Sequence, residues 1–237
     1  MLTDSFDRPI TYLRISVTDR CNLRCVYCMP ADGIQQVAHA EIMRYEEIVE
    51  FVRVAAQAGV SEIRLTGGEP LARAGLPSLV AMLAALPGIR DISLTTNAIL
   101  LERSAAALKE AGLNRVNISI DTLRPERFAQ ITRGGSFDQV WRGILAAEAQ
   151  GLTPVKINVV AMRGVNEDEF LDLARLALDH PWHIRFIELM PVSEPELGGW
   201  GEQLPDPRSA FIPIAEVKQR LAPLGLVPLQ ERSGSGP

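Results

Sequence analysis

All three cysteines of this 237-residue chain lie within eight positions, in the stretch TDRCNLRCVYCMP (18–30). Cys21, Cys25 and Cys28 have the spacing C-x3-C-x2-C and directly follow a segment that predicts a β-strand. Three cysteines cannot pair completely into disulfides, so their close spacing predicts a metal or redox site in a reducing compartment. Three thiolates bound to a four-iron cluster would leave one iron open to a substrate or cofactor.

A zinc site is the alternative for these thiols. Structural zinc takes four ligands, typically from paired C-x2-C units or with histidine. The chain has no fourth cysteine, and we expect its three histidines, which lack zinc-finger spacing, to be structural or at the surface: His39, His180 and His183. The residue types alone leave two candidates, an iron–sulfur cluster with an open iron and a zinc-stabilised module without catalysis.

A second motif, LTGGEP (65–70), follows the second predicted strand. Glycine has no Cβ, so a backbone containing Gly67 and Gly68 can come very close to another group. We therefore expect these two residues to lie against a bound ligand, with their backbone groups available to an ammonium group.

The elements that would position both motifs alternate along the chain. Strands are predicted at 12–18, 61–68, 91–97, 114–121, 154–160 and 183–189. Helices are predicted at 45–59, 76–88, 102–112, 167–178 and 212–225, and helical stretches are predicted between residues 125 and 151. Such strand–helix repeats predict a parallel sheet with right-handed crossovers and helices on one face. We expect an α/β fold, a partial (β/α)6 TIM-like barrel, with a flat doubly wound sheet as the alternative.

Alternation along the strands places polar residues on one face of this sheet. Leu13 and Ile15 have the same parity, so they lie on one face of their strand, and they suit packing against helices. Arg14 lies on the other face. Arg64 and Lys156 lie on the corresponding polar face of their own strands. The polar parity also includes Ser93, Thr95, Asn97, Asn117, Ser119, Asp121 and Asn158. Burying such charges without partners would cost several kcal/mol each. We therefore predict a polar, ligand-filled lumen, with an open sheet that has one solvated face as the alternative.

Composition limits the other possibilities. The formal net charge of −5 gives no support for a nucleic-acid partner, and no apolar run is long enough to span a membrane. The N-terminus does not have the pattern of a signal peptide, so we expect a cytoplasmic protein. We expect a core barrel over residues 1–225 and the start of another segment at 226–237.

The C-x3-C-x2-C motif, with Tyr27 before its last cysteine, and the GGEP segment resemble the radical S-adenosylmethionine (SAM) superfamily. The stretches RISVTDRCNLRC (14–25) and RFIELMP (185–191) resemble one of its families in particular, the GTP 3′,8-cyclases of molybdenum cofactor biosynthesis. The resemblance implies a radical SAM lyase that converts GTP to (8S)-3′,8-cyclo-7,8-dihydroguanosine 5′-triphosphate. It also implies an electron donor such as a flavodoxin or ferredoxin, and it leaves a homodimer open.

The same resemblance implies roles for individual residues. It implies a [4Fe–4S] cluster held by Cys21, Cys25 and Cys28. It implies contacts to SAM from Tyr27, Gly68, Ser119 and Met190. It implies contacts to GTP from Arg14, Arg64, Thr95 and Lys156.

The chain departs from the family pattern at its C-terminal end. Family members carry a second [4Fe–4S] cluster on later cysteines, but this chain has no cysteine after Cys28 and ends in RSGSGP. We therefore expect this chain alone to be incomplete for catalysis, as a fragment of a cyclase. The alternative is a radical SAM enzyme that acts on a peptide or another small molecule.

Overall fold

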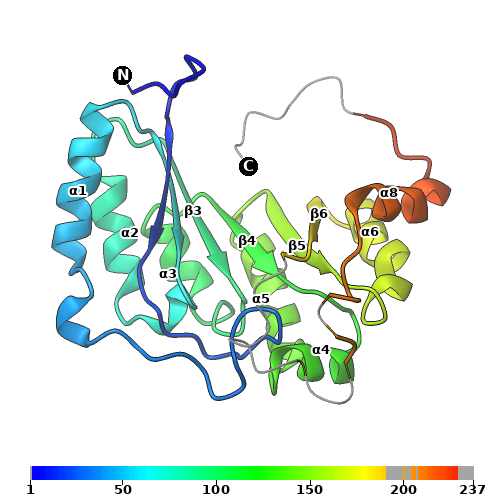
Figure 1. Ribbon diagram of the computed structural model, residues 1–237. Coiled ribbons are helices and arrows are strands. Elements are labelled where there is room, and N and C mark those ends of the chain that lie inside the picture. The colour runs from blue at the N-terminus through cyan, green and yellow to red at the C-terminus, as the bar shows by residue number, and fades with distance from the viewer. Residues whose placement is uncertain (1, 191–199, 201–203, 207, 229–237) are drawn as a thin grey trace.

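The computed structural model of the chain describes residues 2–190, 200, 204–206 and 208–228. Six parallel strands form one sheet in the order β1-β2-β3-β4-β5-β6 (Figure 1). The strands are β1 (Tyr12–Ser16), β2 (Glu62–Thr66), β3 (Asp91–Thr96), β4 (Arg115–Ser119), β5 (Val155–Ala161) and β6 (Trp182–Glu188). The helices are α1 (Tyr45–Gln57), α2 (Leu76–Ala84), α3 (Ala105–Glu110), α4 (Pro125–Thr132), α5 (Phe137–Ala149), α6 (Phe170–Asp179) and α8 (Ile214–Leu221).

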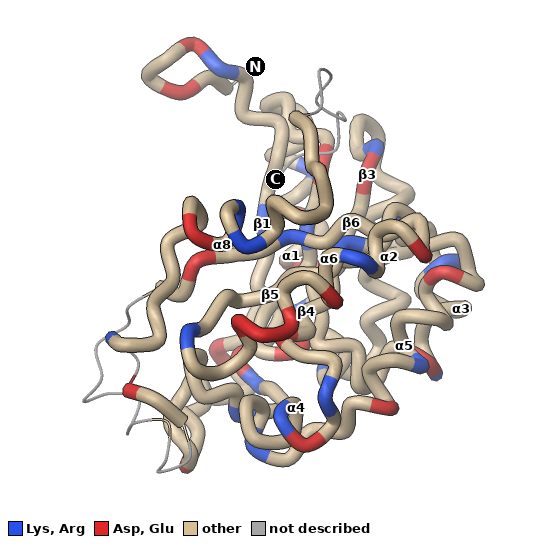
Figure 2. Tube along the Cα trace, turned by 90° about the vertical axis from the view of Figure 1, so that its right-hand side faces the viewer, with Lys and Arg blue, Asp and Glu red and all other residues tan. Residues whose placement is uncertain are grey.

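The strand order confirms the predicted fold class. A doubly wound sheet reverses its strand order at a switch point, whereas here each strand pairs with the next one along the chain. β1 and β6 form the two edges, so the sheet is a partial barrel. Residues 2–9 form a hairpin, closed by a bridge between Thr3 and Pro9, that stands away from the body of the molecule (Figures 1 and 2).

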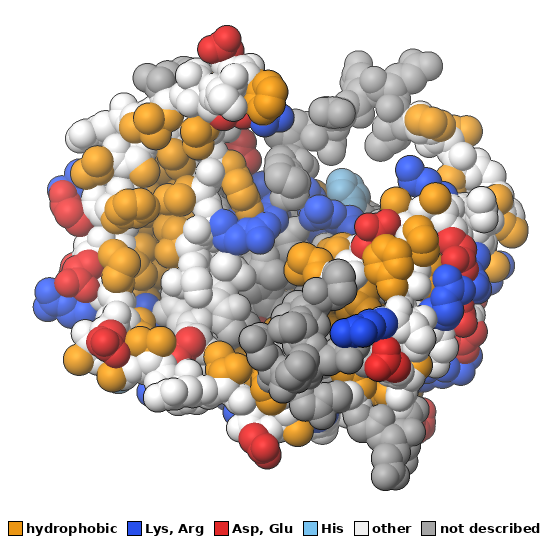
Figure 3. Space-filling model, in the orientation of Figure 1, with side chains coloured by type: hydrophobic (Ala, Val, Ile, Leu, Met, Phe, Trp, Pro, Cys, Tyr) orange, Lys and Arg blue, Asp and Glu red, His pale blue; other side chains and the backbone are white. Residues whose placement is uncertain are grey.

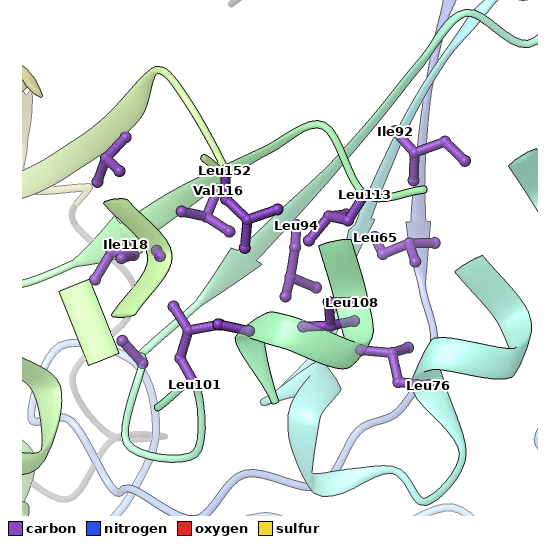
Figure 4. Close-up of a cluster of buried hydrophobic side chains, with 14 of the residues drawn as sticks. Leu65, Leu76, Ile92, Leu94, Leu101, Leu108, Leu113, Val116, Ile118 and Leu152 are labelled. Carbon is purple, nitrogen blue, oxygen red and sulfur yellow. The ribbon is translucent and has the colours of Figure 1, made fainter. Parts of the chain in front are cut away.

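The hydrophobic core lies between the sheet and its helices. Leu65, Leu94 and Ile118, which come from three neighbouring strands, are completely buried and face helix residues such as Leu76 and Leu108 (Figure 4). These strand residues have the apolar parity predicted from the sequence. Full burial of a leucine or isoleucine contributes about 1.5–3 kcal/mol, so this face of the sheet holds the layers together.

The helical stretches predicted between residues 125 and 151 are α4 and α5. They are separate because the residue that caps α4, Arg133, is left-handed and Gly134 follows with a φ of +113°. One local feature differs from the sequence prediction: α3 covers only residues 105–110 of the helix predicted at 102–112. None of the described helices is long and apolar enough to cross a membrane. Most of the predicted 226–237 segment lies outside the described residues.

Helix α8 is attached to the sheet by packing and by charge. Val217 packs in a small apolar cluster with Phe170 of α6. On the surface, the Glu216 carboxylate lies 2.6 Å from Nη2 of Arg163 and accepts a hydrogen bond of 2.9 Å from Arg220. The pair with Arg163 connects α8 to the loop that follows β5, whereas Arg220 lies in α8 itself and holds the Glu216 carboxylate in place.

Candidate functional site

The cysteine loop follows β1, at the carboxyl edge of the parallel sheet. Residues 25–29 make one tight turn, in which the Cys25 carbonyl accepts a hydrogen bond from Cys28 N at 2.9 Å. The same loop is tied to the end of α4, because Val26 N donates to Ile131 O at 2.9 Å. The structure therefore places the thiols at the edge where barrel enzymes carry their active sites.

The three thiols lie close enough to influence one another. Burial raises the pKa of Cys25, and the negative charges of Asp121, Cys28 and Cys21 raise it further. Burial is also the main reason that the pKa values of Cys21 and Cys28 are raised. Three thiolates here would need a cationic partner, which an iron–sulfur cluster supplies, so this donor set fits the implied cluster. Within the described ranges, no three histidine, cysteine or acidic side chains form a group that could hold a single metal ion.

The GGEP segment packs directly on the start of the cysteine loop. Gly68 N donates to Thr18 O and Glu69 N donates to Arg20 O, both at 2.7 Å. A Cβ on Gly67 would lie 2.4 Å from Thr18 O, and one on Gly68 would lie 2.4 Å from Arg20 O. A close approach therefore exists here, and the backbone that the two Cβ positions face is that of residues 18–20.

Glu69 connects this segment to the next strand. Its side chain is buried, and its carboxylate accepts hydrogen bonds from Leu71 N at 3.0 Å, Thr96 Oγ1 at 2.7 Å and Asn97 N at 2.7 Å. Burial raises the pKa of Glu69, while these donors oppose the change. The sequence analysis gave Glu69 no role. The structure shows it as the residue that joins the loops after β2 and β3.

Tyr27 is anchored to the end of β4. Its hydroxyl donates to Asp121 Oδ2 at 2.6 Å, and Val160 N donates to the other oxygen of that carboxylate at 2.8 Å. Burial raises the pKa of Asp121 to about 6, although both hydrogen bonds lower it. Ser119 lies two residues before Asp121, so the structure brings Tyr27 and Ser119 to the same part of the carboxyl edge.

The two other residues implied to contact SAM, Gly68 and Met190, differ in how firmly the rest of the protein holds them. Gly68 lies in the turn beside the cysteine loop, as described above. Met190 follows β6 and has 76 % of its surface exposed, so its side chain is not packed against the other site residues.

The cations predicted to share the polar face do so. Arg14 is opposite Arg64 in the β1–β2 register, and Thr95 and Lys156 are both opposite Asn117, from β3 and β5. Arg64 and Lys156 are each only 4 % exposed. The polar face therefore buries the cations of β2 and β5, while Arg14 on the edge strand β1 is exposed.

The structure adds Arg115 and Arg185 to this group. Burial lowers the pKa of Lys156 to about 8, and the positive charges of Arg115, Arg185 and Arg64 lower it further. Arg115 is paired with Asp91 at 2.8 Å, towards the amino end of the strands. Both added arginines could have been found from parity. Arg115 is two residues before Asn117 and therefore lies on the same face of its strand. Arg185 is two residues after His183, which is opposite Lys156.

His183 was expected to be structural or at the surface, and its side chain is exposed. It is also opposite Lys156 in the β5–β6 register, which places it at the rim of the polar face. Its pKa is lowered by partial burial and then by the charges of Lys156 and Arg185, which favours the neutral imidazole. Figure 3 shows the molecule hollowed between its two sides, with Lys, Arg and His side chains gathered in the hollow.

Several buried polar atoms on this surface have no hydrogen-bond partner among the described residues. They are Tyr12 Oη, Arg115 Nη1, Asn117 Oδ1 and Asn158 Oδ1. Buried polar atoms are nearly always satisfied, by protein or by other bound groups. The two asparagine oxygens need hydrogen-bond donors, whereas Arg115 Nη1 needs an acceptor. Their concentration on the strand face opposite the helices fits an interior that receives a polar molecule with both donors and acceptors.

Comparisons with known proteins agree with this geometry. The model of the Radical SAM superfamily matches residues 15–177. The GTP 3′,8-cyclase of Moorella thermoacetica is 53 % identical over 237 residues, which is 100 % of this chain and 71 % of that protein. The GTP 3′,8-cyclase of Geobacter sulfurreducens is 47 % identical over 237 residues, 100 % of this chain and 70 % of the relative.

Solved structures of radical SAM enzymes share the fold. Streptococcus suis SuiB bound to S-adenosylmethionine has a TM-score of 0.69 at 16 % identity, over 91 % of this chain and 47 % of that one. Methylornithine synthase (PylB) has a TM-score of 0.65 at 19 % identity, over 90 % of this chain and 62 % of that one. At such low identity these similarities concern architecture alone. The superfamily model and the sequence relatives show that the chain belongs to the radical SAM superfamily and, within it, to the GTP 3′,8-cyclase family.

Proposed function

We propose that this protein is the radical SAM lyase that converts GTP to (8S)-3′,8-cyclo-7,8-dihydroguanosine 5′-triphosphate, the first step of molybdenum cofactor biosynthesis. One observation carries the proposal: a partly buried cationic surface on the strands lies on the same sheet whose carboxyl edge carries a loop with three neighbouring thiols. A triphosphate needs the first feature and radical generation needs the second. The whole-chain similarity to GTP 3′,8-cyclases connects the two in one reaction.

In this proposal Cys21, Cys25 and Cys28 hold three irons of a [4Fe–4S] cluster, and the fourth iron is left for SAM. When bound, the cluster and SAM supply a carbon radical that removes hydrogen from C3′ of GTP, so that C3′ can bond to C8 of guanine. The protein contributes alignment and exclusion of water. Tyr27 contributes to alignment, because the hydrogen bond from its hydroxyl to Asp121 holds its ring in one place next to Cys28.

SAM contacts are assigned to Tyr27, Gly68, Ser119 and Met190. The N–H groups of Gly68 and Glu69 are already bonded to the cysteine loop. The carbonyl oxygens of the same turn are therefore the groups suited to accept hydrogen bonds from the methionyl ammonium. Ser119, at the carboxyl end of β4, offers a hydroxyl to the ribose side of the cofactor.

GTP contacts are assigned to Arg14, Arg64, Thr95 and Lys156. Guanidinium groups bind phosphate oxygens through paired hydrogen bonds, and the Lys156 ammonium adds a point charge. Arg115 and Arg185 extend the same positive surface and lower the pKa of Lys156. A bound triphosphate would relieve the repulsion among these cations, which gives the site its preference for polyanionic substrates.

A flavodoxin or ferredoxin as electron donor, a homodimer and a cytoplasmic location remain predictions of the same proposal. Because the donor must reach the cluster, it would approach the carboxyl edge of the sheet, where Cys28 is exposed.

The test is GTP binding and turnover by the anaerobically reconstituted chain, with SAM and dithionite. We expect GTP to bind much more tightly than guanosine, and Lys156→Met to weaken GTP binding by about tenfold, the effect of roughly 1.4 kcal/mol. Lys218→Met, on the exposed surface of α8, is the matched control and should bind like the parent. Chromatography would follow cyclised nucleotide and 5′-deoxyadenosine. A cluster-loaded chain that binds GTP no better than guanosine would contradict the proposal.

A further inference from the structure

Asn97, at the carboxyl end of β3, reaches the cysteine loop with its side-chain amide. Its Nδ2 donates to Asn22 Oδ1 at 2.7 Å and lies 3.9 Å from Cys21 Sγ. Its Oδ1 accepts from Ile99 N at 3.1 Å. Because a flipped amide would place its NH2 group against the Ile99 N–H, these neighbours fix the orientation with the donor facing the sulfur.

The backbone of Asn97 is held equally firmly. Asn97 N donates to Glu69 Oε2 at 2.7 Å, and the other Glu69 oxygen accepts from Thr96 Oγ1 at the same distance. Glu69 is only 1 % exposed. The amide therefore projects from a rigid junction between the loops after β2 and β3 and not from a free loop.

We propose that Asn97 is a positioning residue for the cluster: it fixes the Cys21 arm of the loop and donates a hydrogen bond to the Cys21 sulfur. Leu23 N is a second donor to this sulfur, at 3.4 Å. Hydrogen bonds to cluster sulfurs set the reduction potential, because they stabilise the additional negative charge of the reduced state. Asn97 therefore makes the cluster easier to reduce. This inference rests on the proposed function, because it requires Cys21 to be a cluster ligand.

The test compares Asn97→Ser with Asn114→Ser in the reconstituted chain. A serine oxygen can still accept from Ile99 N but is too short to reach Cys21, and it adds no charge. Asn114 is the matched control, because its Oδ1 also accepts a backbone hydrogen bond, from Ile92 N at 2.7 Å, but before β4 and away from the cysteine loop. Iron content, melting temperature and the electron paramagnetic resonance titration of the cluster are measured.

We expect Asn97→Ser to keep four irons and its melting temperature. At a fixed potential its ratio of reduced to oxidised cluster should fall about tenfold, a shift of about 59 mV to more negative values for one electron. Asn114→Ser should titrate like the parent. An Asn97→Ser cluster with the parent's potential and spectrum would overturn the inference.

A second variant, Asn97→Asp, addresses the case in which Asn97→Ser folds but loses its cluster. Asn97→Asp keeps the size and the acceptor of asparagine but has no donor. If both Asn97 variants fold and lose iron while Asn114→Ser retains it, the positioning role is supported. If both retain iron at the parent's potential, the inference is wrong and the proposed function stands. A parent chain that holds no iron would overturn the proposed function together with this inference.

Discussion

Replacing Gly68 with alanine should detach the cluster loop from the sheet without unfolding the barrel. The new Cβ would lie 2.4 Å from Arg20 O, 2.6 Å from Arg20 C and 2.8 Å from Asp19 O, all of them backbone atoms. The two loops must separate by about 1 Å to restore ordinary contact, which stretches the 2.7 Å bond from Glu69 N to Arg20 O beyond hydrogen-bonding range. Overpacking and the lost hydrogen bond together cost about 2–4 kcal/mol, concentrated next to Cys21.

The assay is iron content per chain after anaerobic reconstitution, together with the thermal melt. We expect Gly68→Ala to retain less than about a tenth of the parent's iron, since 1.4 kcal/mol already corresponds to tenfold. Gly225→Ala is the control: Gly225 has a φ of +62° and nothing within 4 Å of its Cβ position. That variant should lose about 1–2 kcal/mol of stability to backbone strain and keep its iron. If Gly68→Ala loads iron like the parent, the loop contact is not what positions the cysteines.

Three further predictions concern the thiols, the lumen and helix α8. Cys28→Ala should abolish loading of the four-iron cluster while leaving circular dichroism unchanged, because Cys28 supplies one of three ligands; a variant with four irons would contradict this. Because the pKa of Lys156 is lowered to about 8, GTP affinity measured by calorimetry should fall as pH rises from 7 to 9.5, and Lys156→Met should flatten the profile. Arg163 and Arg220 lower the pKa of Glu216 to about 2, below its ordinary 4.5. The stabilisation from Glu216 is therefore present above pH 4.5 and lost as pH falls towards 2, so Glu216→Gln should increase amide exchange in α8 at pH 7 but not near pH 2.

The sequence was sufficient for the architecture because strand parity and strand–helix alternation are local patterns. Arg14, Arg64 and Lys156 were placed on one face by counting alone, and the register confirms this. The same count applied to β4 and β6 would have added Arg115 and Arg185. These were missed because the polar parity was followed in the fourth strand only from Asn117 onward and in the last strand not at all.

Contacts between distant loops could not be predicted in the same way. The GGEP glycines were expected to approach a ligand, and nothing in the sequence indicated that their Cβ positions also face the backbone of residues 18–20. Asn97 and Asp121 had no assigned role, because their partners, Cys21 and Tyr27, are 76 and 94 residues away along the chain. Sequence spacing contains no information about which loops meet at the carboxyl edge; the curvature of the sheet decides that.

The central claim is that the three-cysteine loop and the cationic lumen serve one reaction at C3′ of GTP. It is tested most directly by supplying GTP deuterated at C3′ to the reconstituted chain with SAM and dithionite. Mass spectrometry of the released 5′-deoxyadenosine then shows where its new hydrogen came from. We expect deuterium in 5′-deoxyadenosine, with little cyclised nucleotide because this chain alone is expected to be incomplete for catalysis. The label should be lost when Lys156→Met prevents GTP from being held. Release of unlabelled 5′-deoxyadenosine in the presence of saturating deuterated GTP would contradict the account.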